Sequence, residues 1–210
     1  MAYAVKECFL TLQGEGVQSG SRAVFLRFAG CNLWSGREQD RATAQCNFCD
    51  TDFVGTDGEG GGKFANADSL AEHVLATWGS EGGARLVVIT GGEPMLQLDP
   101  ALIDALHGRG FRVAVESNGT LPAVGGIDWL CISPKAGTDV VQRSGDELKL
   151  VWPQGGVDPV GFESWDFANF LIQPMDCAAR EEALDAAIRL VMDRPKWRLS
   201  LQAHKLIGLP

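Results

Sequence analysis

The segment ARLVVITGGEPMLQLDPALIDALHGRGFRVAVES, residues 84–117, contains two apolar runs that flank a helical pattern. The runs at 84–90 and 111–117 are almost continuously apolar, which is typical of strands buried on both faces of a parallel sheet. Between them, Asp99 provides an N-cap and Pro100 suits the first helical position, while a glycine marks the helix end. The segment therefore predicts a strand, a helix and a second strand in succession.

The same alternation extends over the rest of the chain. Strand-like runs occur at 7–12, 23–28, 128–133, 147–152, 168–173 and 197–202, and helical patterns at 67–78 and 180–194. One face of the last helix is expected to carry Ala183, Leu184, Ala187, Ile188 and Val191. Because a complete eight-unit barrel would need more strong helices, we expect an α/β fold, either a partial β/α barrel or an open sheet, with largely parallel strands.

Length and composition favour small-molecule chemistry. A chain of 210 residues suits one domain, 1–210, around a single core. A net charge of −9 disfavours nucleic-acid binding, and neither a signal peptide nor an apolar run of membrane-spanning length is recognised. We therefore expect a cytoplasmic protein with reduced thiols and no membrane partner. The glycine-rich stretch 55–63 is interpreted as a flexible surface loop.

Cys31, Cys46 and Cys49 are gathered in one polar stretch, which predicts a metal site. A structural zinc ion would need a fourth ligand, and the remaining candidates are Cys8, Cys131, Cys177, His73, His107 and His204. Cys8 and Cys131 lie inside apolar strand patterns, where a cysteine is typically a small buried side chain. Three thiolates also suit an iron–sulfur cluster with one open iron, so spacing alone leaves both metals possible.

A second element follows the strand at 84–90. Thr90 is followed by Gly91 and Gly92, which leave the backbone bare at the sheet edge where α/β folds bind ligands. Glycines allow the backbone to be approached closely. Taken alone the pair is typical of a simple turn, but together with the three-cysteine loop it indicates a ligand site.

The three cysteines and the GGEP element resemble the radical S-adenosylmethionine (SAM) superfamily. More specifically, the chain resembles the 7-carboxy-7-deazaguanine synthase (QueE) family, through motifs that run from residue 12 to residue 210. These are LQGEG (12–16), RFAGCN (27–32), CDT (49–51), TGGEP (90–94), SPK (133–135), QPMD (173–176) and HKLIGLP (204–210). One departure is the fourteen residues between the first two cysteines, where the superfamily usually has three. Closing the longer loop costs only about 1–1.5 kcal/mol, and Trp34 is expected to pack back onto it.

The resemblance implies a modified radical-SAM core and the conversion of 6-carboxy-5,6,7,8-tetrahydropterin to 7-carboxy-7-deazaguanine with loss of ammonia. It implies a [4Fe–4S] cluster on Cys31, Cys46 and Cys49 in a loop spanning 29–53, with Mg²⁺ at Thr51. The implied SAM contacts are Phe48, Cys49, Asp50, Gly92, Ser133, Pro134, Lys135, Gln173, Pro174, Met175 and Asp176. The implied substrate contacts are Leu12, Gln13, Gly14, Glu15, Arg27, Thr90, His204 and Pro210, the last two in a tail spanning 202–210.

Each of these roles has a structural alternative. Arg27 in an apolar strand needs a partner, which is either the substrate carboxylate or a buried acid. Glu15 also suits a turn and Asp176 a helix N-cap, while Ser133 with Pro134 also suits a strand-to-loop junction. His204 could support the fold. The chain end could fray, although Leu206, Ile207 and Leu209 make the tail too apolar for a free end.

Three functions stay open at this point. The first is the ring-contracting lyase, expected to be a homodimer that receives electrons from a donor such as flavodoxin. The second is an activase that installs a glycyl radical in a partner, and the third is a non-catalytic zinc-binding module. A C-terminal extension distinguishes the first two, because only the lyase is expected to use the α-carboxylate of Pro210 to bind its substrate.

Overall fold

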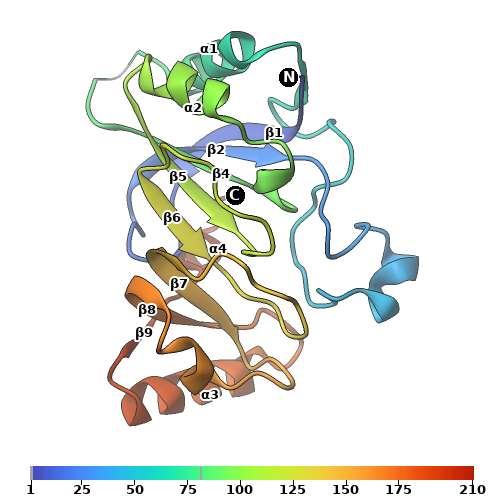
Figure 1. The fold of residues 1–210 in the computed structure, drawn as a ribbon, viewed down its shortest axis with the longest axis vertical. Coiled ribbons are helices and arrows are strands. Elements are labelled where there is room, and N and C mark those ends of the chain that lie inside the picture. Colours follow the sequence, from blue (N-terminus) through green and yellow to red (C-terminus); the bar gives the residue numbers. More distant parts are fainter. Residues whose placement is uncertain (1, 81) are drawn as a thin grey trace.

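The computed structural model describes residues 2–80 and 82–210, which fold around one curved sheet (Figure 1). The strands are β1 (Tyr3–Leu12), β2 (Arg22–Phe28), β3 (Gly62–Phe64), β4 (Arg85–Gly91), β5 (Phe111–Ser117), β6 (Trp129–Ile132), β7 (Ser144–Trp152), β8 (Asp166–Pro174) and β9 (Trp197–Leu199). Their order in the sheet is β3-β1-β2-β4-β5-β6-β7-β8-β9. From β2 to β9 neighbouring strands are parallel, and β1 is antiparallel to both β2 and β3.

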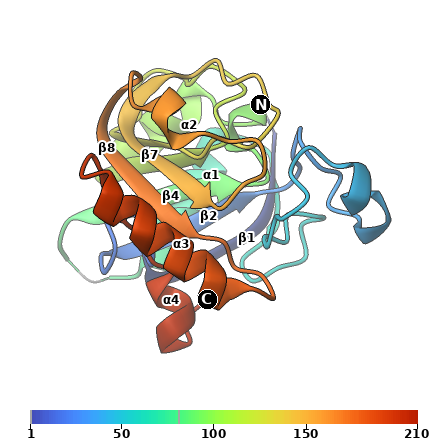
Figure 2. The same cartoon turned by 90° about the horizontal axis from the view of Figure 1, so that it is seen from below.

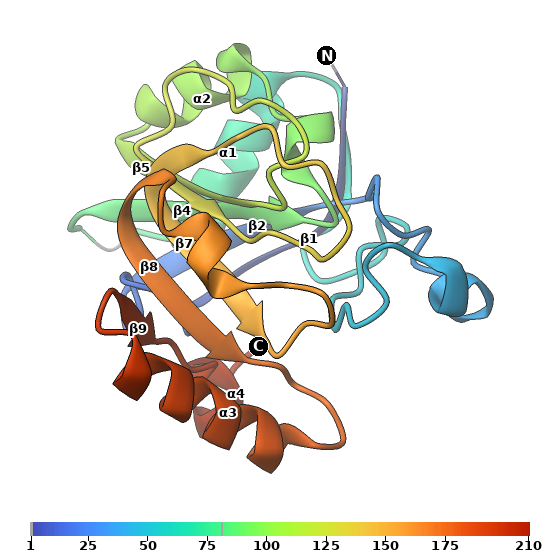
Figure 3. The same ribbon diagram turned by 60° about the horizontal axis from the view of Figure 1, so that its bottom comes forward.

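The sheet curls but does not close, since β3 and β9 are its two edges (Figure 2). The helices are α1 (Ala67–Trp78), α2 (Pro100–His107), α3 (Arg180–Asp193) and α4 (Ala203–Ile207), with short 3₁₀ turns η1 (Glu38–Thr43), η2 (Pro94–Leu96) and η3 (Pro159–Phe162). α1 and α2 cover one end of the sheet, and α3 covers the other (Figures 1 and 3). The expected partial β/α barrel with a largely parallel sheet is therefore confirmed. No helix within 2–80 or 82–210 is long and apolar enough to cross a membrane.

The helix predictions are confirmed together with their capping residues. Asp99 caps α2 by accepting a hydrogen bond from the Leu102 N–H at 3.0 Å, and it also accepts one from the Tyr3 hydroxyl at 2.7 Å. Asn66 caps α1 through the Ser69 N–H at 2.9 Å, in a capping box. Because Asp99 also binds β1, the cap fixes α2 against the sheet as well as starting the helix.

Two local predictions are correct only in part. In α3 the expected Ala183 and Ala187 are buried and Val191 packs against the core, but Ile188 is 41 % exposed. Leu190 completes the packed face, and the two small alanines allow close approach to the sheet.

The glycine-rich stretch is on the surface but is bonded to β1 and ends in β3. The Cys8 N–H donates to the Glu59 carbonyl at 2.7 Å, and the Gly58 N–H donates to the Lys6 carbonyl at 3.0 Å. Gly60 has φ +63°, and a Cβ there would lie 2.2 Å from the Cys8 carbonyl oxygen. The glycines therefore serve close packing against β1, and the interpretation of 55–63 as a flexible loop missed this pairing.

The long insert between Cys31 and Cys46 projects from the barrel, with η1 at its tip (Figure 1). Trp34 is buried, with its ring 5.6 Å from the Phe53 ring and 4.2 Å from the Arg41 guanidinium. The expectation that Trp34 packs back onto the loop is thus confirmed. Arg41 also donates to the backbone carbonyls of Asn47 and Cys49, each at 3.0 Å, so the insert supports the backbone that carries the last cysteine.

Candidate functional site

A cleft of about 510 Å³ opens at the carboxyl ends of the parallel strands, where α/β folds bind ligands. Nearly all the residues that the sequence assigned to SAM, substrate or metal line this cleft. The two exceptions are Gly14 and Pro134. The Pro134 carbonyl accepts a hydrogen bond from Gln154 at 3.2 Å, and Gly14 packs against His204. Gly14 thus lies against a residue that lines the cleft, and Pro134 lies between two residues that do, Ser133 and Lys135.

The three cysteines come together on one side of the cleft. The hydrogen bond between the thiols of Cys46 and Cys49 raises the pKa of Cys46 and lowers that of Cys49 to about 6. Burial raises the pKa of Cys31. The positive charge of Lys135 acts on Cys46 and Cys49 in the direction of the thiolate, the form that binds metal.

The three cysteines are candidate ligands for either metal that the sequence leaves open. Within 2–80 and 82–210, no three His, Cys, Asp or Glu side chains are placed to share one metal ion. In a cluster each cysteine binds its own iron, so its ligands need not converge on one point. Of the other candidates for a zinc ligand, Cys8 and Cys131 are buried in strands and Cys177 is exposed, whereas His204 lines the same cleft.

The glycines after β4 permit close contact between that strand and the cysteine loop. A Cβ on Gly91, whose φ is +149°, would lie 2.5 Å from the Phe28 carbonyl oxygen. A Cβ on Gly92 would lie 2.3 Å from the Gly30 carbonyl oxygen and 2.5 Å from the Cβ of Cys31. These glycines are therefore needed for close packing, Gly91 against the last residue of β2 and Gly92 against the start of the cysteine loop, and the approach of a ligand to them stays a prediction.

Glu93 of the same motif is fully buried. Its carboxylate accepts hydrogen bonds from the Ser117 hydroxyl at 2.8 Å, the Asn118 N–H at 2.8 Å and the Met95 N–H at 2.9 Å. Burial raises its pKa despite these donors. Glu93 therefore links the ends of β4 and β5 beneath the cleft, a role that sequence reasoning missed.

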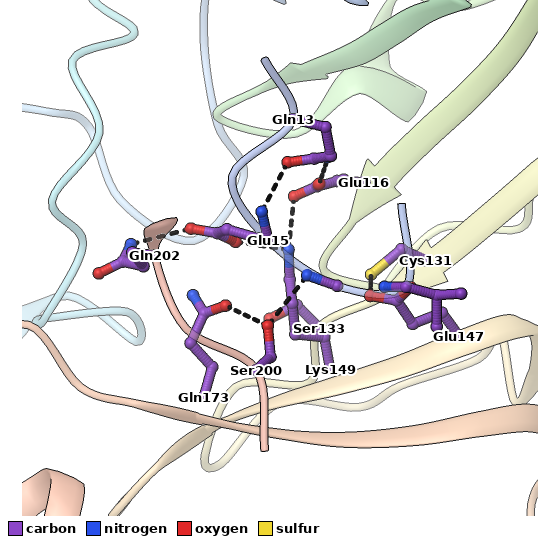
Figure 4. A network of polar contacts seen from close by, with 12 residues as sticks. Gln13, Glu15, Glu116, Cys131, Ser133, Glu147, Lys149, Gln173, Ser200 and Gln202 are labelled. Atoms are coloured by element: carbon purple, nitrogen blue, oxygen red, sulfur yellow. Dashed lines mark hydrogen bonds and ion pairs between the residues drawn. The ribbon is translucent and has the colours of Figure 1, made fainter. Parts of the chain in front are cut away.

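The inner wall of the cleft holds a buried charged group made of Glu15, Glu116 and Lys149 (Figure 4). The Lys149 Nζ lies 2.6 Å from Glu15 Oε2 and 2.9 Å from Glu116 Oε2, and its side chain is only 3 % exposed. Burial alone would raise the pKa of Glu15, but Lys149, with hydrogen bonds from Gln202 and Gln173, lowers it to about 2. Burial would lower the pKa of Lys149, but the two carboxylates raise it, so Lys149 and Glu15 are both charged at neutral pH.

Gln13 extends this group toward the substrate loop. Its Nε2 donates to Glu116 at 2.9 Å, and its Oε1 accepts from the Glu15 N–H at 3.0 Å (Figure 4). Glu15 is thus a member of a buried network and not a solvated turn residue. Sequence reasoning missed Glu116 and Lys149, although a charged residue inside each of the apolar runs FRVAVES and ELKLVW was a visible signal.

Arg27 is paired with an acid at the rim of the same cleft. Its Nε lies 2.6 Å from Glu7 Oε1, so the ion pair that was the structural alternative is present. Among the described residues, its terminal guanidinium nitrogens make no hydrogen bond. Since both Arg27 and Glu7 line the cleft, a ligand carboxylate can meet those nitrogens without breaking the pair.

The tail is fixed in place by polar contacts. The Ala203 N–H donates to the Gly14 carbonyl at 2.8 Å, and the Thr11 hydroxyl donates to the Pro210 carbonyl oxygen at 3.2 Å. Leu206 and Ile207 are 75 % and 60 % exposed, so burial of these apolar side chains is not what orders the tail. The tail was correctly expected to be ordered, but for the wrong reason.

Lys205 joins this tail to two other segments. Its Nζ lies 2.7 Å from Asp50 Oδ2 and 2.6 Å from Asp176 Oδ2. Asp176 is therefore an ion-pair partner and not a helix cap, which was its structural alternative, since α3 begins after Ala179 without a side-chain cap.

Comparisons with known proteins agree on one family. The chain is 60 % identical over 210 residues to 7-carboxy-7-deazaguanine synthase of Bordetella pertussis and 61 % identical over 210 residues to that of Caulobacter vibrioides. Both alignments cover all of this chain and all of the relative. More distantly, the Bacteroides thetaiotaomicron protein of the same name is 40 % identical over 209 residues, again over both full lengths.

A solved structure shows the same fold. The crystal structure of QueE from Escherichia coli superposes with a TM-score of 0.68 at 26 % sequence identity. The match covers 97 % of this chain and 95 % of that one. No family model matches the sequence.

Proposed function

Because this chain belongs to the 7-carboxy-7-deazaguanine synthase family, we propose that its cleft carries out the ring contraction for which that family is named. The protein is a radical SAM lyase that converts 6-carboxy-5,6,7,8-tetrahydropterin to 7-carboxy-7-deazaguanine with loss of ammonia, in the biosynthesis of queuosine and other 7-deazapurines. One observation supports this most strongly: the cysteine loop, the β4 glycines and the C-terminal tail, far apart in sequence, line a single cleft. One continuous sheet supports a single domain over 1–210.

The proposed [4Fe–4S] cluster is held by Cys31, Cys46 and Cys49, and its fourth iron is left for SAM. The residues proposed to hold SAM are Phe48, Cys49, Asp50, Gly92, Ser133, Pro134, Lys135, Gln173, Pro174, Met175 and Asp176. When bound, cluster and SAM together supply a 5′-deoxyadenosyl radical that takes a hydrogen atom from the substrate. The protein's own contribution is to orient the two ligands and exclude other reactions. Lys135 favours the thiolates that the cluster requires.

The substrate is proposed to lie between Arg27 and the chain end. The terminal nitrogens of Arg27 receive the pterin carboxylate, and the α-carboxylate of Pro210 accepts hydrogen bonds from the amino-pyrimidinone end. Gln13, which both donates and accepts, meets the mixed edge of the pterin ring together with Leu12 and Thr90. Glu15 and Gly14 act behind them, Glu15 through Lys149 and Gly14 by giving His204 room.

Magnesium is proposed to bind at Thr51, with water and substrate oxygens completing its shell. A hard cation prefers oxygen ligands and keeps several waters, so a single protein hydroxyl is a sufficient anchor. Thr51 lines the cleft between Asp50 and Asp52. If Thr51 is a ligand, Thr51→Ala should raise the Mg²⁺ concentration needed for turnover, whereas Thr138→Ala, outside the cleft, should not.

We also propose a homodimer in the cytoplasm that receives electrons from a donor such as flavodoxin. Support for the dimer comes from apolar side chains exposed near the tail, among them Leu201, Leu206 and Ile207. The molar mass in solution tests it, and a monomer would count against it. Reduced thiols suit a reducing compartment, and a low-potential cluster needs an external electron source.

The proposed function is tested by reconstituting the protein with iron and sulfide in the absence of oxygen. We expect broad visible absorbance that bleaches on reduction, and a deazaguanine product when SAM, the carboxytetrahydropterin and Mg²⁺ are added. Cys46→Ala should lose the absorbance, while Cys177→Ala, the exposed cysteine, should keep it. A colourless protein with stoichiometric zinc would support the zinc module instead. A cluster without product would favour the activase.

A further inference from the structure

The short helix α4 connects the segments proposed to hold SAM with the tail proposed to hold the pterin. Lys205 on α4 lies 2.7 Å from Asp50, which follows the last cysteine, and 2.6 Å from Asp176, which follows β8. On the same helix, His204 packs against Gly14 of the substrate loop. The Lys205 ammonium thus binds two segments of the proposed SAM site, and Lys205 itself belongs to the tail of the proposed pterin site.

This ammonium holds together groups that would otherwise repel. Asp50 and Asp176 are both within hydrogen-bond distance of the same nitrogen, so without it two carboxylates would face each other. Gln202, one turn earlier, donates to Glu15 at 2.9 Å and more weakly to Asp50 at 3.5 Å. The polar contacts of the tail with the cluster loop and the β8 segment therefore depend mainly on Lys205.

Ordinary surface ion pairs contribute little to stability, and the three side chains here are 37–45 % exposed. The position of Lys205 matters for another reason. Within its own chain the segment 201–210 has few apolar anchors, since Leu201, Leu206 and Ile207 are all exposed there. A segment held mainly by polar contacts has a low cost of local opening, and its closure responds to whatever orders its partners.

We propose that Lys205 is a positioning residue that makes the binding of SAM and the binding of the pterin mutually favourable. This inference rests on the proposed function. SAM orders the segments that contain Asp50 and Asp176, these order α4 through Lys205, and α4 brings His204 and Pro210 to the pterin. The conformational entropy that the tail loses on closing is then already lost when the first ligand has bound, so the second ligand binds more tightly. Such coupling is reciprocal, so the pterin tightens SAM by the same factor.

The test is equilibrium binding to the cluster-loaded protein without reductant, so that no turnover occurs. SAM affinity is measured with and without the carboxytetrahydropterin, and pterin affinity with and without SAM. In the parent we expect each ligand to tighten the other on the order of tenfold, equally in both directions. Lys205→Met should bring this factor close to one, and Lys205→Arg, which keeps the charge, should restore most of it.

Lys63 provides the matched control, because it is an exposed lysine on β3 outside the cleft. Lys63→Met should leave both affinities and their coupling unchanged. A second readout is the hydrogen exchange of residues 201–210: SAM alone should protect them in the parent and in Lys63→Met, but not in Lys205→Met. A residue that only stabilised the fold would change exchange equally with and without SAM.

The outcomes separate the two proposals. A Lys205→Met protein that keeps the parental coupling factor would overturn the role of Lys205, as would a parent that binds both ligands independently. In either case the proposed function would stand, because both ligands bind. A parent protein that binds neither ligand would overturn the proposed function together with this inference.

Discussion

Among the described residues, Lys149 is the only cation in contact with both Glu15 and Glu116 on the inner wall of the cleft, and replacing it with methionine removes that charge. Lys149 lies 2.6 Å from Glu15 and 2.9 Å from Glu116, and it is almost completely buried. At these distances each attraction is about 6 kcal/mol with an effective dielectric constant of ~20, most of which is offset by desolvation. Removing one partner of a buried group, however, leaves the other charges uncompensated, and we expect the free energy of unfolding to fall by about 3–5 kcal/mol.

The pH dependence of this loss identifies its cause. In the parent, the pKa of Glu15 is lowered from 4.5 to about 2, so its stabilising contribution is present above pH 4.5 and is lost between 4.5 and 2. Without Lys149, burial instead raises the pKa of Glu15 above its unfolded value. The folded variant then takes up a proton that the unfolded chain does not, and becomes relatively more stable as the pH falls toward 4.5.

The assay is urea unfolding of parent and Lys149→Met in the same cluster state, at about pH 7.5 and pH 5. The deficit of the variant should be larger at the higher pH. Adding Glu116→Gln to Lys149→Met should recover part of the stability at the higher pH, because one of the uncompensated charges is gone. Lys63→Met is the control, with no change expected. A deficit below about 1 kcal/mol, or one that is equal at both pH values, would refute the reasoning.

Three further predictions concern the surroundings of the cleft. Arg41→Ala removes the hydrogen bonds to the carbonyls of Asn47 and Cys49, each at 3.0 Å, so a chelator should remove iron from the cluster several-fold faster. An unchanged rate of iron loss would contradict the supporting role of the insert. Gly14→Ala places a Cβ 2.1 Å from His204 Nδ1 and should weaken pterin binding by displacing the tail, whereas Gly125→Ala, with nothing within 4 Å, should not. Glu93→Ala leaves two buried donors and one partly buried donor unpaired and should lower the free energy of unfolding by about 3 kcal/mol or more, with Glu93→Gln less severe; equal losses would show that charge and not hydrogen bonding is what Glu93 supplies.

The sequence was sufficient to predict the elements whose signals are local. Strand runs and helix caps depend on neighbouring residues, so α1, α2 and most strands could be located, including Asp99 as the cap of α2. The three-residue β3 was missed because Gly62, Lys63 and Phe64 pair with β1 through backbone groups and are too few to show a side-chain pattern. In α3 the two alanines and Val191 were correctly placed on the packed face, but Ile188 was not, because the orientation of a helix on β8 depends on tertiary packing.

For the site, motif resemblance brought most of the cleft-lining residues together, whereas the residues that support them could not be located in the same way. Lys149 meets Glu15 across 134 positions of sequence and Glu116 across 33. Only the fold decides which buried charges become partners. The same limit applies to Lys205, whose two acids lie 155 and 29 positions away. Charged residues inside apolar strands were the one local signal that partners of this kind exist.

The central claim is that this cleft contracts the pterin ring by radical chemistry in which SAM is regenerated. The net reaction is redox-neutral, so the 5′-deoxyadenosyl radical can be re-formed after each turnover. The most direct measurement is an anaerobic turnover assay with the reconstituted protein and reductant, in which deazaguanine product, ammonia and 5′-deoxyadenosine are quantified together. The account predicts equal amounts of deazaguanine and ammonia, far in excess of the 5′-deoxyadenosine. Absence of deazaguanine, or one 5′-deoxyadenosine released for each product formed, would contradict it.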